Sequence, residues 1–439
     1  MKILFVGHDI SYAQFYSALT KELAHDKGIE CFHIYLRPSA NIYAKLIPAI
    51  KSSSLALSRL LGRAKENDND EIDLKFYESA LSNSKKSKLI KLYSCYKSKF
   101  ALEINSKLKY IDVAIMPGEY RLFEQAIVNT LRHYSPQTKI LYFEAGPPGY
   151  LYIDQQGVNA NSSITKTKFS NILSEALETN KSNCRNFHFH QSPPKILKNS
   201  LLIIDLIWLF FTRIYGGLCD LHEYNSAFIN RIKKIPNKIF QKINLKLNKS
   251  EFQKNKAFTY LLYAGQVSSD VNSTHFGIKN EEILVKLYEL LDTSNLIRII
   301  WRDHPLEKQI GLFNTVEQKY KGRVFKLDNL SLDQSLSLVN GVVTVNSNTA
   351  IESLSKGLPL YLLGKAYYQL VYGVTAHKSK FIAFCNNHKI KGANPTIIED
   401  IQIFIKNSFF PIDYRGGNYE NIYLIRNYLI NLKSKLNAK

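Results

Sequence analysis

Two carboxylates, Glu144 and Asp154, stand in a stretch of the chain that is rich in turn-forming residues. The apolar run 140–143 precedes Glu144 and predicts a buried strand. The residues that then fix a loop are Gly146, Pro147, Pro148, Gly149 and Gly157, followed by Asn159, Asn161, Ser162 and Ser163. A strand that ends in a carboxylate and runs into such a loop places that carboxylate at the mouth of a cleft. An ordinary turn-rich loop is the alternative interpretation.

A second set of polar residues follows predicted strands in the second half of the chain. Its members are Asp270, Arg302, His304, Ser347, Asn348 and Thr349. Ligands of parallel α/β sheets bind beyond the carboxyl ends of the strands, so this set predicts a ligand site.

The run 347–349 also opens a predicted helix, whose free N–H groups and dipole favour an anion such as phosphate. Arg302 and His304 can add charge-assisted hydrogen bonds to the same phosphate. The alternative is that the run only caps the helix. A cap needs one such residue and the run has three, so we favour phosphate.

The elements that must position Glu144 form an alternating pattern in the first half. Strands are predicted at Lys2–Val6, Glu30–Tyr35 and Tyr110–Met116, with helices at Tyr12–His25 and Leu122–His133. This β-α-β opening indicates a doubly wound parallel sheet. One glycine at the first turn is too few for the dinucleotide-binding fingerprint. The polar residues 41–109 are predicted to be helices on the rim of the domain.

The second half repeats the alternation. Predicted strands are Ala257–Ala264, Leu296–Trp301, Val324–Leu327, Gly341–Val345 and Leu360–Leu363, with helices at Glu281–Leu291, Gly311–Lys321, Leu332–Val339 and Ala350–Lys356. The basic stretch 231–256 is the best candidate for a linker, which divides the chain into residues 1–245 and 246–439. We expect the last helix to pack back on the N-terminal domain. Two Rossmann-like halves joined by a linker and facing a central cleft describe the GT-B architecture.

Composition limits the class of protein. A chain of 439 residues suggests two domains, and its net charge of +21 implies an anionic partner. No RNA- or DNA-binding motif is present, so we expect no nucleic acid. The five cysteines are far apart and form no CxxC pair, which favours free thiols in a reducing compartment. No secretory signal opens the chain, so a cytoplasmic protein is expected.

Two further segments have alternative interpretations. His188 and His190 invite a metal site, but their alternation with phenylalanine suits a strand face or loop better, and we expect no metal. The apolar run 201–215, interrupted by Asp205, is too short to span a bilayer. A buried helix is the favoured interpretation, and a helix in the membrane interface, with aromatic anchors such as Trp208, is the alternative.

Five motifs together resemble the capsular-polysaccharide and lipopolysaccharide β-Kdo transferases, which use CMP-Kdo. The first motif is E-x-G, followed by proline and then D-x-x-G-V-N. It is matched by residues 144–146, the two prolines that follow, and residues 154–159. The others are Gln266 to Asp270, Arg302-Asp303-His304-Pro305, Asn346-Ser347 with Glu352-Ser353-Leu354 and Gly357-Leu358-Pro359, and Gly364 to Tyr368. Each motif is weak alone, but five in the right order are specific. The resemblance covers residues 141–163 and 260–373.

The resemblance implies a retaining transfer of Kdo from CMP-β-Kdo to a glycan or glycolipid acceptor of the bacterial surface. Retention by double displacement needs a carboxylate nucleophile, and we expect Asp270 in this role because it lies in the half that binds the donor. Glu144 is then the expected acid/base. Asp154 is the competitor for the nucleophile, or a residue that orders the loop or holds the acceptor. The expected donor contacts are Gln266, Arg302, His304, Pro305, Ser347, Asn348, Thr349 and Glu352. CMP-Kdo is a donor substrate, and no cofactor is expected. Lipid-linked acceptors and the basic charge together predict peripheral association with the inner membrane.

Two alternatives from other classes stay open. A sialyltransferase-like enzyme also uses a CMP-sugar and an H-P pair, but transfers with inversion. A non-catalytic polyanion binder is suggested by the net charge of +21 alone.

Overall fold

The computed structural model describes residues 1–47, 50–55, 72–74, 83–107, 110–166, 201, 203–208, 210–211, 254–267, 270–305, 307–326 and 330–437. The chain forms two compact units. The N-terminal unit comprises Met1–Ser163, Phe169–Tyr224 and Lys406–Lys439, and the C-terminal unit comprises Ile164–Lys168 and Asn225–Ile405. The boundary predicted between residues 245 and 246 lies outside the described residues, as do His188 and His190.

The N-terminal unit is built on a six-stranded sheet with the order β3-β2-β1-β4-β5-β6. Its strands are β1 (Lys2–Gly7), β2 (Glu30–Tyr35), β3 (Lys51–Ser54), β4 (Val113–Met116), β5 (Lys139–Ala145) and β6 (Leu151–Asp154). Neighbouring strands are parallel except β5 and β6, which are antiparallel. The strand order reverses between β1 and β4, and ligands of such sheets bind at the carboxyl ends beside this switch point.

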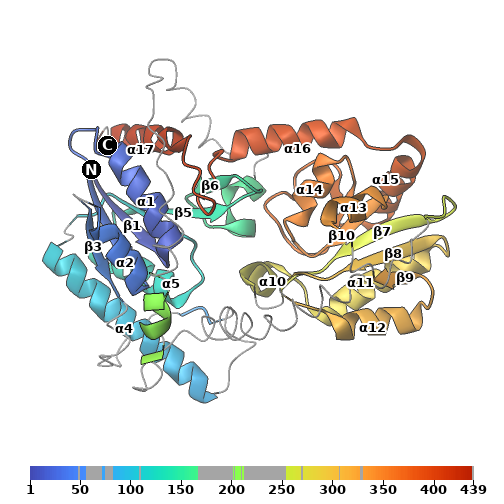
Figure 1. Ribbon diagram of the computed structural model, residues 1–439, viewed down its shortest axis with the longest axis horizontal. Helices are drawn as coiled ribbons and strands as arrows, with labels where there is room; N and C mark the ends of the chain where they lie inside the picture. Colours follow the sequence, from blue (N-terminus) through green and yellow to red (C-terminus); the bar gives the residue numbers. More distant parts are fainter. Residues whose placement is uncertain are drawn as a thin grey trace. The chain divides into compact units, whose positions relative to one another are not determined.

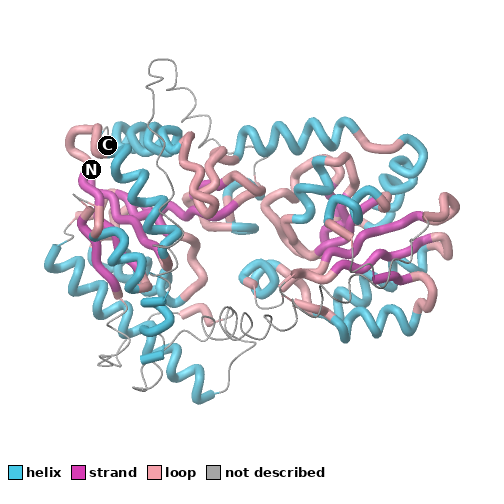
Figure 2. The backbone as a smooth tube through the Cα atoms, in the orientation of Figure 1, coloured by secondary structure: helices cyan, strands magenta, loops and turns pink. Residues whose placement is uncertain are grey.

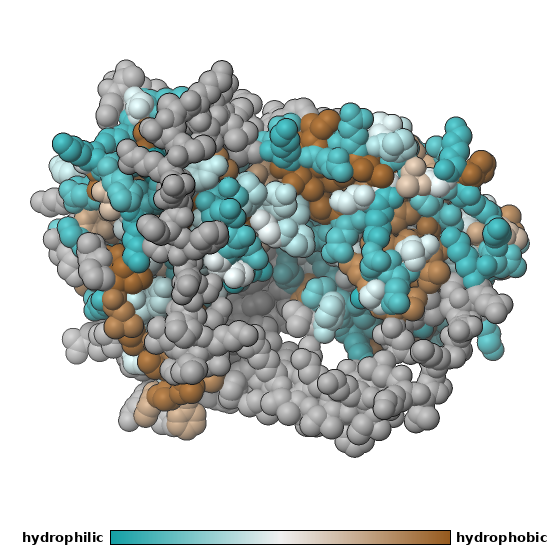
Figure 3. Space-filling view, turned by 45° about the horizontal axis from the view of Figure 1, so that its top comes forward, coloured by the Kyte–Doolittle hydropathy of each residue, from teal (hydrophilic) through white to brown (hydrophobic). Residues whose placement is uncertain are grey.

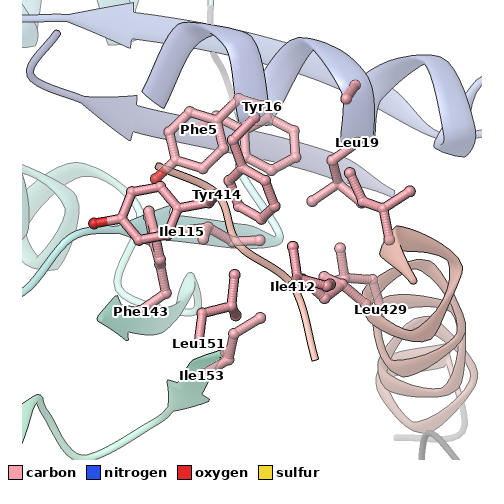
Figure 4. Close-up of a cluster of buried hydrophobic side chains, with 14 of the residues drawn as sticks. Phe5, Tyr16, Leu19, Ile115, Phe143, Leu151, Ile153, Ile412, Tyr414 and Leu429 are labelled. Carbon is pink, nitrogen blue, oxygen red and sulfur yellow. The ribbon is translucent and has the colours of Figure 1, made fainter. Parts of the chain in front are cut away.

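Helices cover this sheet on both faces (Figure 1). They are α1 (Ile10–Leu23), α2 (Pro38–Lys45), α4 (Asn83–Lys107), α5 (Leu122–Tyr134) and the C-terminal α17 (Ile422–Asn437). Side chains of α1 and α17 share one apolar core with the sheet, in which Leu19 and Leu429 are buried (Figure 4). Arg426 of α17 also binds Asp26, just past α1, with two hydrogen bonds of 2.7 Å. The last helix is therefore a structural part of the N-terminal unit.

The C-terminal unit holds a second six-stranded sheet, β12-β11-β10-β7-β8-β9, in which every pair is parallel. Its strands are drawn in magenta in Figure 2. Its strands are β7 (Thr259–Ala264), β8 (Ile297–Arg302), β9 (Val324–Lys326), β10 (Gly341–Thr344), β11 (Leu360–Leu362) and β12 (Val374–Thr375). Its helices are α10 (Val271–Phe276), α11 (Asn280–Thr293), α12 (Ile310–Lys319), α13 (Leu332–Ser337), α14 (Thr349–Ser355), α15 (Lys378–Lys391) and α16 (Pro395–Ser408). The order reverses between β7 and β10, so this switch point lies between the exits of those strands. The predicted α/β class with two Rossmann-like domains is confirmed.

Three local predictions need correction. The stretch after Glu144 is not one loop, because residues 151–154 pair with β5 as an antiparallel strand and Asp154 ends it. The polar region 41–109, predicted to be helical, contains the edge strand β3. Serines and a lysine give that strand no apolar alternation, so periodicity could not reveal it.

The apolar run 201–215 is the third correction. Its described residues are helical, but only Leu201 and Asp205 are buried, and Ser39 of α2 donates to the Asp205 carboxylate. The other face exposes large apolar side chains: Ile203, Leu206, Ile207, Phe210 and Phe211. The prediction of a fully buried helix is therefore wrong. Figure 3 shows an apolar strip at the lower left and further apolar patches at the upper right, among hydrophilic side chains. Within the described residues, no helix is both long and apolar enough to cross a bilayer.

Candidate functional site

A buried pair of side-chain amides, Gln266 and Asn346, ties the exits of β7 and β10 together. Gln266 Nε2 donates to Asn346 Oδ1, and Gln266 Oε1 accepts from the Asn346 backbone at 3.2 Å. Asn346 Nδ2 also donates to the carbonyls of Asn272 and Lys365, at 2.7 and 3.2 Å. The structure thus places Gln266, predicted to contact the donor, as a residue that fixes the two loops beside the switch point.

The β10 exit loop is held from several sides. Ser347 Oγ accepts from the Thr349 backbone N–H at 3.3 Å, just before α14. Tyr368 donates to the Ser347 carbonyl at 2.8 Å, and Tyr367 donates to Asn348 Oδ1 at 2.9 Å. Asn348 is the N-cap residue of α14 but makes no side-chain cap hydrogen bond, and it is exposed at the tip of this loop. A loop held in this way is pre-organised for a ligand.

The β8 exit loop carries Arg302 and His304 on either side of a structural carboxylate. Asp303 accepts from Trp301 Nε1 at 3.0 Å and from the Gln309 backbone at 3.1 Å, and Lys326 Nζ lies 2.5 Å away. Burial alone would raise the pKa of Asp303, but these hydrogen bonds and the lysine charge outweigh it and hold the pKa below its usual value. An ionised Asp303 fixes the loop that presents His304 and the exposed Pro305.

The two loops approach closely because residue 265 is glycine. A Cβ there would lie 3.1 Å from the Arg302 carbonyl oxygen. Arg302 itself is partly committed, since its Nη1 donates to the Leu330 carbonyl at 2.7 Å. His304 and Arg302 therefore flank the exit of β7, but only part of the Arg302 guanidinium remains for a ligand.

The predicted nucleophile Asp270 is exposed and caps α10. Its Oδ1 accepts from the Asn272 backbone at 2.9 Å. Its other oxygen, Oδ2, has no hydrogen-bond donor among the described residues. Glu352 is exposed in the first turn of α14. Both carboxylates are thus open to solvent near the carboxyl edge of the C-terminal sheet.

In the N-terminal unit, Glu144 stands at the carboxyl end of β5 and is partly exposed, at 28%. Its Oε1 accepts from the Ala145 backbone at 3.1 Å and lies 3.9 Å from Nη2 of Arg415. Burial and, to a lesser extent, the Glu144 charge raise the pKa of the nearby Tyr414 to about 12. Glu144 is placed where a catalytic carboxyl at a sheet edge would stand.

Asp154 has a different environment, since only 1% of it is exposed. Its Oδ1 accepts from the backbones of Gln156 and Gly157 at 2.7 and 3.3 Å. Its Oδ2 accepts from the backbone and hydroxyl of Ser163 at 2.8 and 2.5 Å. Four donors saturate the carboxylate, so the geometry favours the loop-ordering role of Asp154 over the nucleophilic one.

Sequence reasoning did not single out Glu119, which follows β4 at the switch point. Its carboxylate accepts from the Val158 backbone at 3.1 Å and from Asn161 Nδ2 at 3.2 Å. A Cβ at Gly157 would lie 2.5 Å from Glu119 Oε1, so the glycine of the D-x-x-G-V-N motif makes room for this carboxyl. Burial raises the pKa of Glu119 to about 7, although its hydrogen bonds act in the opposite direction. The signal available was a carboxylate at the exit of a predicted strand, here directly after Gly118.

His8, at the exit of β1, was also missed. Arg121 Nη1 lies 3.0 Å from His8 Nδ1, and because a guanidinium can only donate, Nδ1 must accept. The proton of the neutral ring is then on Nε2, which lies 2.5 Å from Oε1 of the buried Glu124. Polar side chains from β1, β4 and β5 therefore gather at the carboxyl edge of the N-terminal sheet.

Two mostly parallel sheets, each with polar side chains at its switch point, define an α/β protein with two Rossmann-like units, the fold class expected for a GT-B-like architecture. The chain belongs to the family of capsule polysaccharide biosynthesis proteins, whose model matches residues 130–395. That range includes the Glu144–Asp154 stretch and the strand exits of the C-terminal unit. The resemblance to transferases of capsule and lipopolysaccharide synthesis is thereby confirmed at the level of the family.

Solved structures with a similar fold are distant. The β-Kdo 2,7 transferase KpsC of Thermosulfurimonas dismutans is 14% identical with a TM-score of 0.37, over 81% of this chain and 98% of that one. The S. aureus MnaA–UDP structure is 12% identical with a TM-score of 0.33, over 98% and 96%. At such identities and TM-scores the likeness carries no functional argument. The search of curated proteins gave no match.

Proposed function

We propose that this protein is a retaining glycosyltransferase that moves Kdo from CMP-β-Kdo to a glycan acceptor of the bacterial surface. The observation that carries the proposal is the family match over 130–395, because it spans all five motifs that resemble the β-Kdo transferases. The placement of the polar residues supports it, since the proposed acid/base Glu144 and the proposed nucleophile Asp270 both stand at or just past the carboxyl ends of parallel-paired strands.

The C-terminal unit binds the CMP-sugar in this proposal. His304, Arg302 and Ser347 meet the phosphate, and their charge and hydrogen bonds stabilise it as the bond to the sugar breaks. Pro305, Asn348, Thr349 and Glu352 line the same loops, while Gln266 contributes by holding the loops through Asn346.

Asp270 is the proposed nucleophile. Its free oxygen attacks the anomeric carbon, CMP leaves with the electron pair of the broken bond, and a Kdo–aspartyl ester forms. The acceptor hydroxyl then displaces Asp270, and Glu144 takes the hydroxyl proton. Asp154 orders the loop that follows β6. The polar residues alone carry these steps, without a cofactor.

The test is to mix the full-length protein with CMP-Kdo generated in situ and to measure CMP release and intact mass. One added Kdo is expected on the wild type and none on Asp270→Asn, which should still bind CMP. An adduct that survives in Asp270→Asn but disappears in Asp154→Asn would reverse the assignment. Product of inverted configuration, without any adduct, would instead favour the sialyltransferase-like alternative.

Peripheral association with the inner membrane belongs to the same proposal, because lipid-linked acceptors are at that surface. The net charge of +21 and the exposed apolar face of residues 203–211 support it. Equal sedimentation with neutral and anionic vesicles at low salt would refute the electrostatic part.

A further inference from the structure

The C-terminal segment, residues 409–419, brings an arginine to the catalytic carboxyl of the N-terminal unit. The backbone of Phe410 pairs with Leu151 of β6 through hydrogen bonds of 2.7 and 3.0 Å. Ile412 and Tyr414 are buried in the same core as Phe143 (Figure 4). The segment is therefore fixed on the N-terminal sheet beside β5 and β6.

A tight turn at 413–418 presents Arg415 from this fixed segment. Asp413 Oδ1 accepts from the Gly416 backbone at 2.8 Å, and the Asp413 carbonyl accepts from Gly417 and Asn418 at 2.9 and 3.0 Å. A Cβ at Gly416 would collide with the Asp413 carboxylate, and Gly417 has a φ of 82°. The positive φ favours glycine at Gly417, and the nearby carboxylate favours the absence of a side chain at Gly416.

The guanidinium of Arg415 is oriented by a buried tyrosine and keeps an open edge. Its Nε donates to Tyr414 Oη at 2.9 Å, and Tyr414 is only 3% exposed. Its Nη2 is 3.9 Å from Glu144 Oε1, and the Arg415 side chain is 65% exposed. Nη1 has no hydrogen-bond partner among the described residues. A separation of 3.9 Å between exposed groups contributes little stability, so the pair alone gives the oriented arginine no clear structural role.

An oriented guanidinium with an open edge suits a carboxylate, which it binds with two parallel hydrogen bonds. The substrate proposed above carries such a carboxylate on its keto-sugar acid.

We propose that Arg415, oriented by Tyr414, binds the carboxylate of a sugar-acid substrate next to Glu144. The identity of the sugar acid rests on the proposed function, while the carboxylate site rests on the geometry of the N-terminal unit. Arg415 lies outside residues 130–395, the range matched by the family.

The test measures the affinity of the full-length protein for Kdo and for its methyl ester by calorimetry. Arg415→Gln should weaken Kdo binding about ten- to hundredfold and leave the ester unchanged. Arg415→Lys should recover part of the lost Kdo affinity, because lysine keeps the positive charge but lacks the planar guanidinium that makes two parallel hydrogen bonds to a carboxylate. Tyr414→Phe should give a smaller loss, since the ring still fills the core while the hydroxyl that orients Nε is gone.

Arg132→Gln is the matched control. Arg132 is exposed in the last turn of α5, which lies at the opposite edge of the sheet, so this variant should bind Kdo like the wild type. Wild-type affinity in Arg415→Gln, an equal loss for acid and ester, or no preference of the wild type for the acid would each overturn the inference.

The proposed transfer reaction and the proposed carboxylate site can be refuted independently of each other. If the wild type releases CMP from CMP-Kdo but Arg415→Gln keeps its Kdo affinity, only the carboxylate site is wrong. If Kdo affinity depends on Arg415 but CMP is neither bound nor released, only the proposed transfer reaction is wrong.

Discussion

The carboxyl groups at the edge of the N-terminal sheet differ in what surrounds them. Asp154 is buried and saturated by four donors, whereas Glu144 is partly exposed and has one backbone donor. Glu119 is largely removed from water, and burial raises its pKa to about 7. Asp154 is therefore a structural anchor, Glu144 is a candidate acid/base, and Glu119 is a carboxyl group that can hold a proton near neutral pH.

The raised pKa of Glu119 predicts a pH-dependent stability. The unfolded carboxyl has a pKa near 4.5 and the folded one a pKa of about 7. Between these values the folded protein binds more protons, so stability falls as the pH rises through this window. Glu119→Gln removes that fall and can still accept from Val158. We expect it to be more stable than the wild type at pH 8 by on the order of 1 kcal/mol, allowing for partial exposure.

Urea denaturation at pH 4.5, 6 and 8 measures this effect. Glu420→Gln, a change at an exposed side chain, is the control and should follow the wild-type curve. A Glu119→Gln variant that loses stability equally at every pH would show that the carboxylate is needed for its hydrogen bonds and does not carry the extra proton.

At the scale of elements, the exits of the strands hold the candidate site residues and are themselves held by buried polar contacts. Gln266 and Asn346 tie β7 to β10, Asp303 fixes the turn after β8, and Asp154 gathers the loop after β6. These contacts position residues on irregular backbone, which would otherwise sample many conformations.

Asp154→Asn tests this role for the loop after β6. The amide would direct an NH₂ group at donors that now face a carboxylate oxygen, so we expect a loss of about 2–4 kcal/mol of unfolding free energy. Ser163→Ala removes one of the donors and should cost about 1 kcal/mol. Guanidinium denaturation followed by circular dichroism measures both variants. Wild-type stability in Asp154→Asn would contradict the anchoring role and revive its candidacy as nucleophile.

At the scale of the whole molecule, the chain returns to its first domain. Residues 406–439 belong to the N-terminal unit, where α17 adds Ile425 and Leu429 to the core and the preceding turn adds Arg415. The N-terminal unit is thus completed only when residues 406–437 have been added.

Leu429→Ala should destabilise the N-terminal unit selectively. Leu429 is fully buried, and such a truncation costs about 2–5 kcal/mol. Hydrogen exchange by mass spectrometry should show faster exchange in β1 and β5, with β7 and β8 and the affinity for CMP unchanged. Ser434→Ala, at an exposed position of α17, is the control. Equal acceleration in both sheets would show that the two units unfold together.

The sequence alone determined both sheets, because buried parallel strands are runs of apolar residues and their periodicity is local. The runs 3–6, 297–301 and 341–345 are strands in the structure close to the expected limits, and their exits carry the predicted Arg302, His304 and Ser347. The edge strands β3, β6 and β12 escaped prediction, since edge pairing depends on a neighbour more than on composition.

Only the tertiary structure decided which carboxylates are available. Asp154 and Glu144 look alike in the sequence, yet one is saturated by Ser163 and the other faces Arg415, a residue far along the chain. Glu119 meets its partner Val158 only because β6 folds back beside β5. The environment of a side chain is set by contacts between distant segments, and local periodicity carries no information about them.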